Sequence, residues 1–188
     1  MPPIVYNLDM IAIFFADGFE EGEAIVPTDM LRRAGLEVKT VSITDSNKVV
    51  GSHNITIETD LIWDEFNAKD YDALILPGGL RGTENLTNFA PLGEAIKAHN
   101  EAGKLCCAIC AAPSVLGKLG ILSGKKYTCY PGFESDSFGG DYQDNYVTHD
   151  GNIITARAMG ASVEFAREII KTLKPAGLPQ VEEGIQYE

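Results

Sequence analysis

The chain of 188 residues is long enough for one domain with a sizeable hydrophobic core. Apolar residues make up 45% of it and charged residues 22%, which excludes wholesale disorder. Fifteen basic against 27 acidic residues give a net charge of −12, and no basic patch is visible that could meet nucleic-acid phosphates. No apolar run approaches the ~20 residues of a membrane-spanning helix, and the N-terminus lacks the basic flank of a signal peptide. We therefore expect a cytoplasmic protein with neither a nucleic-acid nor a membrane partner.

Short apolar runs of strand length alternate with longer amphipathic segments. In chain order, the first half predicts a strand over residues 10–16, a helix ending at Ala34-Gly35, a strand over 37–43, a hairpin or edge excursion over 49–59, and a strand over 72–76. Gly35 suits a helix C-cap, and Pro27 predicts either a kink in the first helix or a restart near that residue.

The second half continues the alternation. It predicts a helix over residues 92–102, a strand over 104–109, a helix over 111–119, a short strand over 127–129, a hairpin from 146–148 and 152–155, and a last helix over 161–173. This pattern predicts an α/β fold, in which a mostly parallel sheet carries helices on both faces. Residues 1–188 are interpreted as a single domain whose residues 176–188 form a loosely packed tail.

In open parallel sheets the functional crevice lies beyond the carboxyl ends of the strands. Three segments follow apolar strands directly and are therefore candidates: residues 17–23, 77–81 and 110–113. Within the third, Cys110 stands between a predicted buried strand and a helix, the position of a nucleophile elbow, although alanines replace the usual glycines. A helix N-terminus favours the thiolate, so this position predicts a lowered pKa for the thiol. The alternative is that Cys110, like Cys106 and Cys107, is a small buried hydrophobic residue.

Glu23 is the second candidate. The acidic residues Glu20 and Glu21 suit a helix N-terminus without any function, but Glu23 is followed by an apolar run that points inward. A carboxyl buried beside a thiol has a raised pKa, so it can act as an acid or a base near neutral pH. Gly78 and Gly79 are compatible with a simple turn or with backbone N–H groups that approach a reacting centre.

Other chemistries have weaker support. Cys107 and Cys110 have C-x-x-C spacing, but Cys107 lies inside a predicted strand, whereas the redox motif begins a helix. The histidines at 53, 99 and 149 show no metal-ligand spacing, so no metal is expected. Neither a dinucleotide-binding nor a P-loop motif is present, so no cofactor is expected.

Three segments resemble a known family. Residues 15–23 (FADGFEEGE), with Pro27 and residues 31–35 (LRRAG), residues 76–79 (LPGG), and residues 108–113 (AICAAP) look like the ThiJ/PfpI superfamily. More narrowly, they resemble its Parkinson-disease-protein branch, often written DJ-one. The resemblance covers nearly the whole chain. It implies a flavodoxin-like three-layer sandwich, usually a homodimer.

The resemblance also implies site residues. It places a nucleophilic, acidic thiol at Cys110, a protonated glutamate at Glu23, and oxyanion-binding N–H groups at Gly79 and Ala111. Two departures concern the rest of the pocket. Tyr130 stands where the branch often has histidine, and His53 stands where relatives contribute an arginine across the dimer. Peptidase relatives carry histidine directly after the nucleophile, so Ala111 argues against proteolysis.

Two hypotheses follow from the resemblance. The first is a glutathione-independent glyoxalase or protein deglycase, acting on small α-oxoaldehydes such as methylglyoxal, which forms a hemithioacetal on Cys110 while Glu23 shuttles protons to give lactate. The second is a redox-sensing stress protein or chaperone, in which Cys110 is oxidised to sulfinate without dedicated turnover. A purely structural domain would require three coincident motifs.

Overall fold

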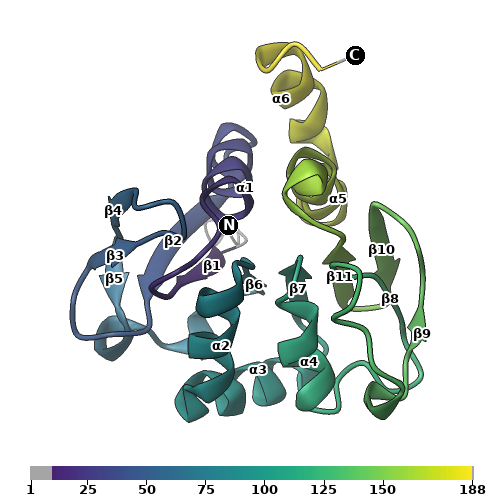
Figure 1. Ribbon diagram of the computed structural model, residues 1–188. Helices are drawn as coiled ribbons and strands as arrows, with labels where there is room; N and C mark the ends of the chain where they lie inside the picture. The colour runs from purple at the N-terminus through teal and green to yellow at the C-terminus, as the bar shows by residue number, and fades with distance from the viewer. Residues whose placement is uncertain (1–9, 188) are drawn as a thin grey trace, which may run out of the picture.

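The computed structural model describes residues 10–187, in which a seven-stranded sheet lies between two layers of helices (Figure 1). The sheet order is β10-β11-β7-β6-β1-β2-β5, and every neighbouring pair is parallel except the edge pair β10 and β11. Its strands are β1 (Met10–Phe15), β2 (Glu37–Ser42), β5 (Leu61–Ile62), β6 (Ala73–Leu76), β7 (Leu105–Ile109), β10 (Val147–Asp150) and β11 (Ile153–Ala156). Two small ribbons are β3 (Lys48–Val50) with β4 (Thr56–Glu58), and β8 (Lys126–Tyr127) with β9 (Asp141–Tyr142).

Six α-helices divide between the two faces of the sheet (Figure 1). One face carries α1 (Glu21–Arg33), α5 (Ser162–Leu173) and α6 (Leu178–Gly184); the other carries α2 (Leu80–Asn88), α3 (Ala90–Glu101) and α4 (Pro113–Lys118). The flavodoxin-like three-layer sandwich implied by the resemblance is therefore confirmed.

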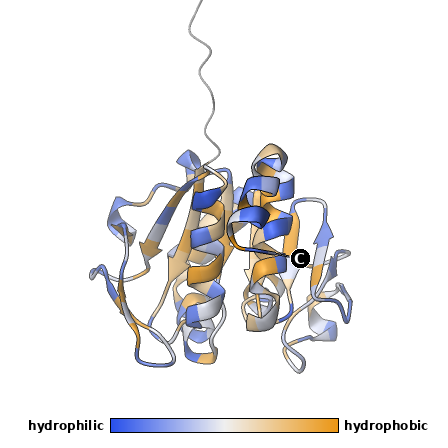
Figure 2. Cartoon of the chain, turned by 90° about the horizontal axis from the view of Figure 1, so that it is seen from above, coloured by the Kyte–Doolittle hydropathy of each residue, from blue (hydrophilic) through white to orange (hydrophobic). Residues whose placement is uncertain are grey.

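The alternation of side chains along β1 explains the two layers, because successive residues of a strand point to opposite faces. Ile11, Ile13 and Phe15 belong to the core beneath α1 and α5, whereas Ala12 and Phe14 belong to the core beneath the other three helices. All five are at most 1% exposed. In Figure 2 orange is concentrated in the central strands, whereas blue lies on the outer parts of the helices, in loops and at an edge strand. A strand that is buried on both faces therefore has a continuous apolar sequence.

The predicted strands of the sheet all exist, with small shifts at their ends, and the 49–59 segment forms the β3–β4 hairpin. Pro27 lies inside α1, which runs through it without a break. One helix was not anticipated, and the start of another was misplaced. Helix α2 was not predicted, because LRGTENLTN contains a glycine and only two leucines. Helix α4 begins at Pro113 rather than at residue 111, since a proline is favoured in the first turn.

Residues 176–188 were expected to form a loosely packed tail, and over the described residues this is also wrong. Helix α6 contacts α1 and α5, and Val181 is 1% exposed. Arg167 of α5 also forms an ion pair with Glu182 of α6 and lies 4.2 Å from the ring centre of Tyr187. None of the helices in the described part of the chain has the length and apolar character that crossing a bilayer requires.

Candidate active site

Cys110 occupies the tight turn between β7 and α4. Its φ of +65° lies in the left-handed region, which is costly for a residue with a side chain. Two backbone hydrogen bonds hold it there: its N–H donates to Ala156 (2.9 Å), and its carbonyl accepts from Tyr130 (2.7 Å). Cys110 is partly exposed, whereas Cys106, Cys107 and Cys129 are buried. The geometry is that of a strained elbow with a partly exposed cysteine at its tip.

Glu23 lies in the first turn of α1 and is 1% exposed. Its carboxyl group is hydrogen-bonded to the Cys110 thiol, and its Oε2 accepts a hydrogen bond from the N–H of Gly78 (2.9 Å). Burial raises the pKa of Glu23 to about 7, and the nearby Glu20 charge acts in the same direction. The expected raised pKa is therefore confirmed. Near neutral pH this carboxyl can either give or take a proton.

The two glycines after β6 make room for this pair. A Cβ on Gly78 would lie 2.4 Å from Oε2 of Glu23 and 2.6 Å from Cβ of Cys110. Gly79 has a φ of +88°, and a Cβ there would lie 2.3 Å from the carbonyl oxygen of Gly18. The backbone groups of Gly79 and Ala111 lie near the sulfur of Cys110 and act to lower the pKa of its thiol. Two backbone donors therefore converge where negative charge would develop.

The expected acidity of Cys110 is not borne out. Burial raises the pKa of the thiol to about 12, and the charge of Glu23 raises it further, against the two backbone N–H donors. A helix N-terminus acts only over its first turn, and α4 begins three residues after Cys110 and is six residues long. Burial and the charge of a Glu23 carboxylate therefore act together against a thiolate at this position.

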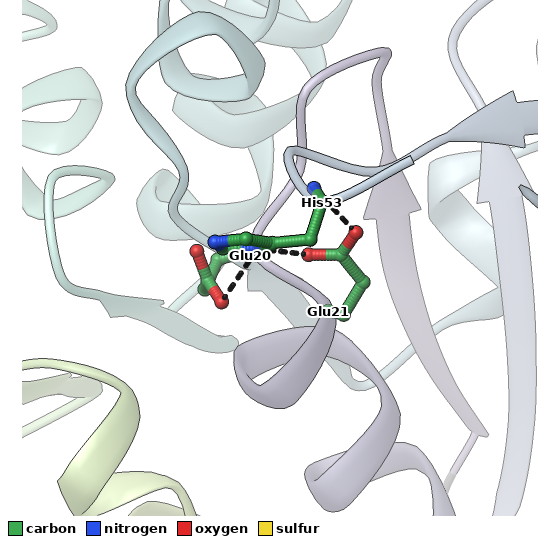
Figure 3. A group of neighbouring side chains, drawn as sticks. All are labelled: Glu20, Glu21 and His53. Atoms are coloured by element: carbon green, nitrogen blue, oxygen red, sulfur yellow. Dashed lines mark hydrogen bonds and ion pairs between the residues drawn. The ribbon is translucent and has the colours of Figure 1, made fainter. Parts of the chain in front are cut away.

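Tyr130 and His53 do not join the Cys110–Glu23 pair as side chains. Tyr130 contributes its backbone N–H to the turn, and its ring is 47% exposed and packs edge-on against Phe133. His53 lies on the β3–β4 hairpin and hydrogen-bonds to Glu21 instead (Figure 3).

Glu20, Glu21 and His53 form a polar cluster at the start of α1 (Figure 3). The Nδ1 atom of His53 lies 3.0 Å from Oε2 of Glu21 and 3.6 Å from Oε1 of Glu20. The Ser52 hydroxyl donates to both carboxylates. Three metal-ligating side chains thus lie within 4.8 Å of one another, a proximity that sequence spacing did not reveal. Here the imidazole of His53 hydrogen-bonds to Glu21 and lies at ion-pair distance from Glu20, in an arrangement that tethers the hairpin to α1.

Met159 is a site residue that the sequence analysis missed. Its backbone lies near the Glu23 carboxyl and acts to lower the pKa of Glu23, opposing the effect of burial. It lies in a single 3₁₀ turn that begins shortly after β11. Functional residues lie beyond the carboxyl ends of parallel strands, so the predicted strand over residues 152–155 could have indicated this turn.

Comparison with known proteins places these segments in context. A model of the DJ-1/PfpI family matches residues 9–172 of the chain. A deglycase from Pyrococcus abyssi is 36% identical over 166 residues, which cover 87% of this chain and 99% of that protein.

The dj-1beta protein of Drosophila melanogaster is 36% identical over 174 residues, covering 91% of each chain. Its crystal structure is similar with a TM-score of 0.89, at 34% identity and covering 96% of this chain and 98% of that chain. A cysteine-to-alanine mutant of a DJ-1 superfamily protein from Salmonella typhimurium gives a TM-score of 0.90 at 35% identity, covering 96% of this chain and 99% of that chain.

Proposed function

The chain belongs to the DJ-1/PfpI family, and on that premise we propose that it is a cysteine-dependent enzyme that converts methylglyoxal to lactate without glutathione. The observation that carries the proposal is the hydrogen-bonded pair of a partly exposed Cys110 and a buried Glu23. The named deglycase among its relatives supports an enzymatic function of this type.

In the first step, the sulfur of Cys110 adds to the aldehyde carbon while Glu23 takes the thiol proton. A pKa near 7 leaves about half of Glu23 ionised at neutral pH, so the base is available without a free thiolate. The N–H groups of Gly79 and Ala111 are placed at the sulfur, where they can donate to the developing oxyanion. Glu23 then returns that proton to the oxyanion, which gives a hemithioacetal and restores the carboxylate.

In the second step, the carboxylate of Glu23 removes the proton from the former aldehyde carbon and returns it to the adjacent carbon, while the hydroxyl proton of the hemithioacetal passes to the neighbouring ketone oxygen. The first carbon is oxidised to a thioester and the second is reduced to an alcohol, so no external electron acceptor is needed. Water then cleaves the thioester, which releases lactate and regenerates the thiol. Removal of methylglyoxal from an amine to which it has just added would use the same residues.

The test is lactate formation from methylglyoxal without glutathione, measured for the wild type, Cys110→Ser and Glu23→Gln. We expect many turnovers per chain in the wild type, none in Cys110→Ser, and a loss of at least about a hundredfold in Glu23→Gln, as for removal of a general base. Lys97→Ala on α3, an exposed position, is the matched surface control. At most one turnover per wild-type chain would rule out the enzyme.

A redox-sensing role is the second candidate, and one observation favours it: Cys110 is the partly exposed cysteine, while the three others are buried. Two equivalents of peroxide would oxidise its sulfur to sulfinate and release water, and the acid form of Glu23 could donate a hydrogen bond to the product. Intact mass after peroxide titration would then show two added oxygen atoms, which Cys110→Ser would lose. Catalytic lactate formation distinguishes the first proposal from this one.

A homodimer through α1 and the β3–β4 hairpin is also part of the proposal. Exposed apolar side chains lie on these two elements: Ile25 is 41%, Val50 is 40% and Ile55 is 52% exposed. Glu21 connects the two elements through the backbone N–H of His53 (2.8 Å), so they form one continuous surface. We expect the wild type to sediment as a dimer, and Ile55→Glu to shift it toward monomer.

A further inference from the structure

The polar cluster of Glu20, Glu21 and His53 offers a set of donor atoms that suits a transition-metal ion. Two carboxylate oxygens and one imidazole nitrogen lie within 4.8 Å of one another (Figure 3). Zinc is held by such nitrogen and oxygen donors, whereas magnesium and calcium are held by oxygen. The imidazole therefore indicates an ion of the zinc class. No metal was expected from the sequence, because His53 lies 32 positions from Glu21.

The spacing of the donor atoms is close to what a tetrahedral ion requires. Ligand atoms about 2.1 Å from a zinc ion lie about 3.4 Å from one another. The Nδ1 atom of His53 is 3.0 Å from Oε2 of Glu21 and 3.6 Å from Oε1 of Glu20. Two of the three separations thus match already, and a small rotation of the partly exposed Glu20 side chain would adjust the third.

Backbone hydrogen bonds hold the β3–β4 hairpin and the start of α1 in this arrangement. The N–H of Ser52 donates to the carbonyl of Phe19 (2.8 Å), and the N–H of His53 donates to Oε1 of Glu21 (2.8 Å). Gly51 permits this approach, because a Cβ at that position would collide with the Glu21 carboxyl group. The fold therefore positions the donor atoms before any ion binds, which favours tight coordination.

The charges of the cluster are not balanced. Within residues 10–187, the only ion-pair partner of Glu20 and of Glu21 is His53, and neither carboxylate has a lysine or arginine partner. Even a protonated imidazole leaves one negative charge in excess, although Glu21 is only 7% exposed. Buried charges in proteins are normally paired or coordinate a metal ion. A divalent cation would balance both carboxylates and would bind the neutral form of the imidazole.

The cluster is also accessible. The side chain of His53 is 68% exposed, so an ion can reach the three donors without any opening of the fold. Structural zinc sites are closed by four protein ligands, whereas three protein ligands leave one position for water. The cluster therefore has the ligand number of an open site.

Another histidine–glutamate pair in the chain shows what distinguishes the cluster. The Nδ1 atom of His149 lies 2.9 Å from Oε1 of Glu168. In the part of the chain that the structure describes, no third metal-ligating side chain joins this pair. Two donors are too few for tight binding of zinc, which takes at least three protein ligands in its known sites. The second carboxylate, from Glu20, is therefore the decisive difference.

We propose that Glu20, Glu21 and His53 form a binding site for one divalent ion of the zinc class. Oε2 of Glu21 and Nδ1 of His53 are the donors fixed by the hairpin, Glu20 supplies the third, and water completes the coordination. The bound ion joins the hairpin to α1 by direct metal–ligand bonds. Because the site does not include Cys110, it is independent of the reaction proposed above.

Calorimetric titration of the full chain with zinc chloride tests the proposal. We expect one ion per chain in the wild type and equal affinity in Cys110→Ser, which separates the cluster from the thiol. His53→Ala and Glu20→Gln should each bind at least about tenfold more weakly, since loss of even an outer-shell partner costs this much. His149→Ala removes the imidazole of the two-donor pair, so it is the matched control and should bind like the wild type.

NMR spectra of the wild type provide a readout that needs no variant. Addition of zinc chloride should shift the ring signals of His53 and leave those of His149 in place. A wild type that binds no zinc overturns the proposal. So does binding that is lost in Cys110→Ser, or binding that persists unchanged in both His53→Ala and Glu20→Gln. Zinc-dependent shifts at other histidines with none at His53 have the same meaning.

Discussion

The backbone N–H of Gly78 donates a hydrogen bond of 2.9 Å to Oε2 of Glu23, a residue 55 positions earlier in the chain. This bond joins the turn after β6 to the first turn of α1, and Cys110 at the end of β7 is hydrogen-bonded to the same carboxyl group. Three loops at the carboxyl ends of neighbouring parallel strands therefore meet at one buried acid. Because the acid is buried, its proton affinity is coupled to folding.

The pH dependence of stability should report the buried acid. The pKa of Glu23 is raised from 4.5 to about 7, so the folded chain holds this proton more tightly than the unfolded chain. The resulting stabilisation is complete below pH 4.5 and is lost as the pH rises through about 7. Between those limits we expect the free energy of unfolding to fall by up to about 3 kcal/mol relative to Glu23→Gln, which cannot ionise. Urea unfolding of the wild type and of Glu23→Gln at several pH values measures this fall. The same pH dependence of the free energy of unfolding in both proteins would contradict the prediction.

Gly78→Ala should disrupt the Cys110–Glu23 pair. The added methyl group would meet Oε2 of Glu23 at 2.4 Å and Cβ of Cys110 at 2.6 Å, so one of them must move. We expect lactate formation to fall at least about tenfold, since misplaced catalytic groups lose effective concentration. Gly93→Ala is the matched control, because its new methyl group meets Leu119 at an ordinary 3.4 Å within helix α3. Equal activity in the two variants would show that the fit at Gly78 is not required.

Two replacements of Cys110 separate the cost of its backbone conformation from the loss of its sulfur atom. Cys110 has a φ of +65°, which glycine adopts freely and alanine does not. Neither Cys110→Gly nor Cys110→Ala retains a sulfur atom, so both should be inactive. We expect Cys110→Gly to be the more stable of the two by about 1 kcal/mol. Denaturant unfolding measures the difference, and a more stable alanine variant would mean that the turn holds no strain.

Sequence patterns predicted the sheet well because its central strands are buried on both faces. The apolar sequences of residues 10–16 and 104–109 fit few structures other than a buried parallel strand. The structure places β1 and β7 there. Helix α2 was missed because its pattern is polar and interrupted by Gly82. What stabilises it is tertiary contact with α3 and α4, which propensity along one segment does not encode.

For the site, the rule about strand ends located Cys110, Glu23 and the two glycines, because that rule follows from topology alone. The raised pKa of Cys110 was not foreseen, since it depends on how far α4 begins from the thiol and on how deeply the thiol is buried. Likewise, His53 is 32 positions from Glu21, and only the folding of the hairpin brings the two together. Long-range proximity of this kind has no local signature in one sequence.

The contact between His53 and Glu21 should be visible in the titration of the imidazole. The hydrogen bond to Glu21 is the largest cause that raises the pKa of His53 above 6.5, followed by the charges of Glu20 and Glu21. In NMR spectra across pH 5–9, we expect His53 to titrate above the usual range in the wild type. In Glu21→Gln the pKa should move back toward 6.5, because the carboxylate partner is gone. An unchanged His53 curve would show that the hairpin does not hold its imidazole against α1 in solution.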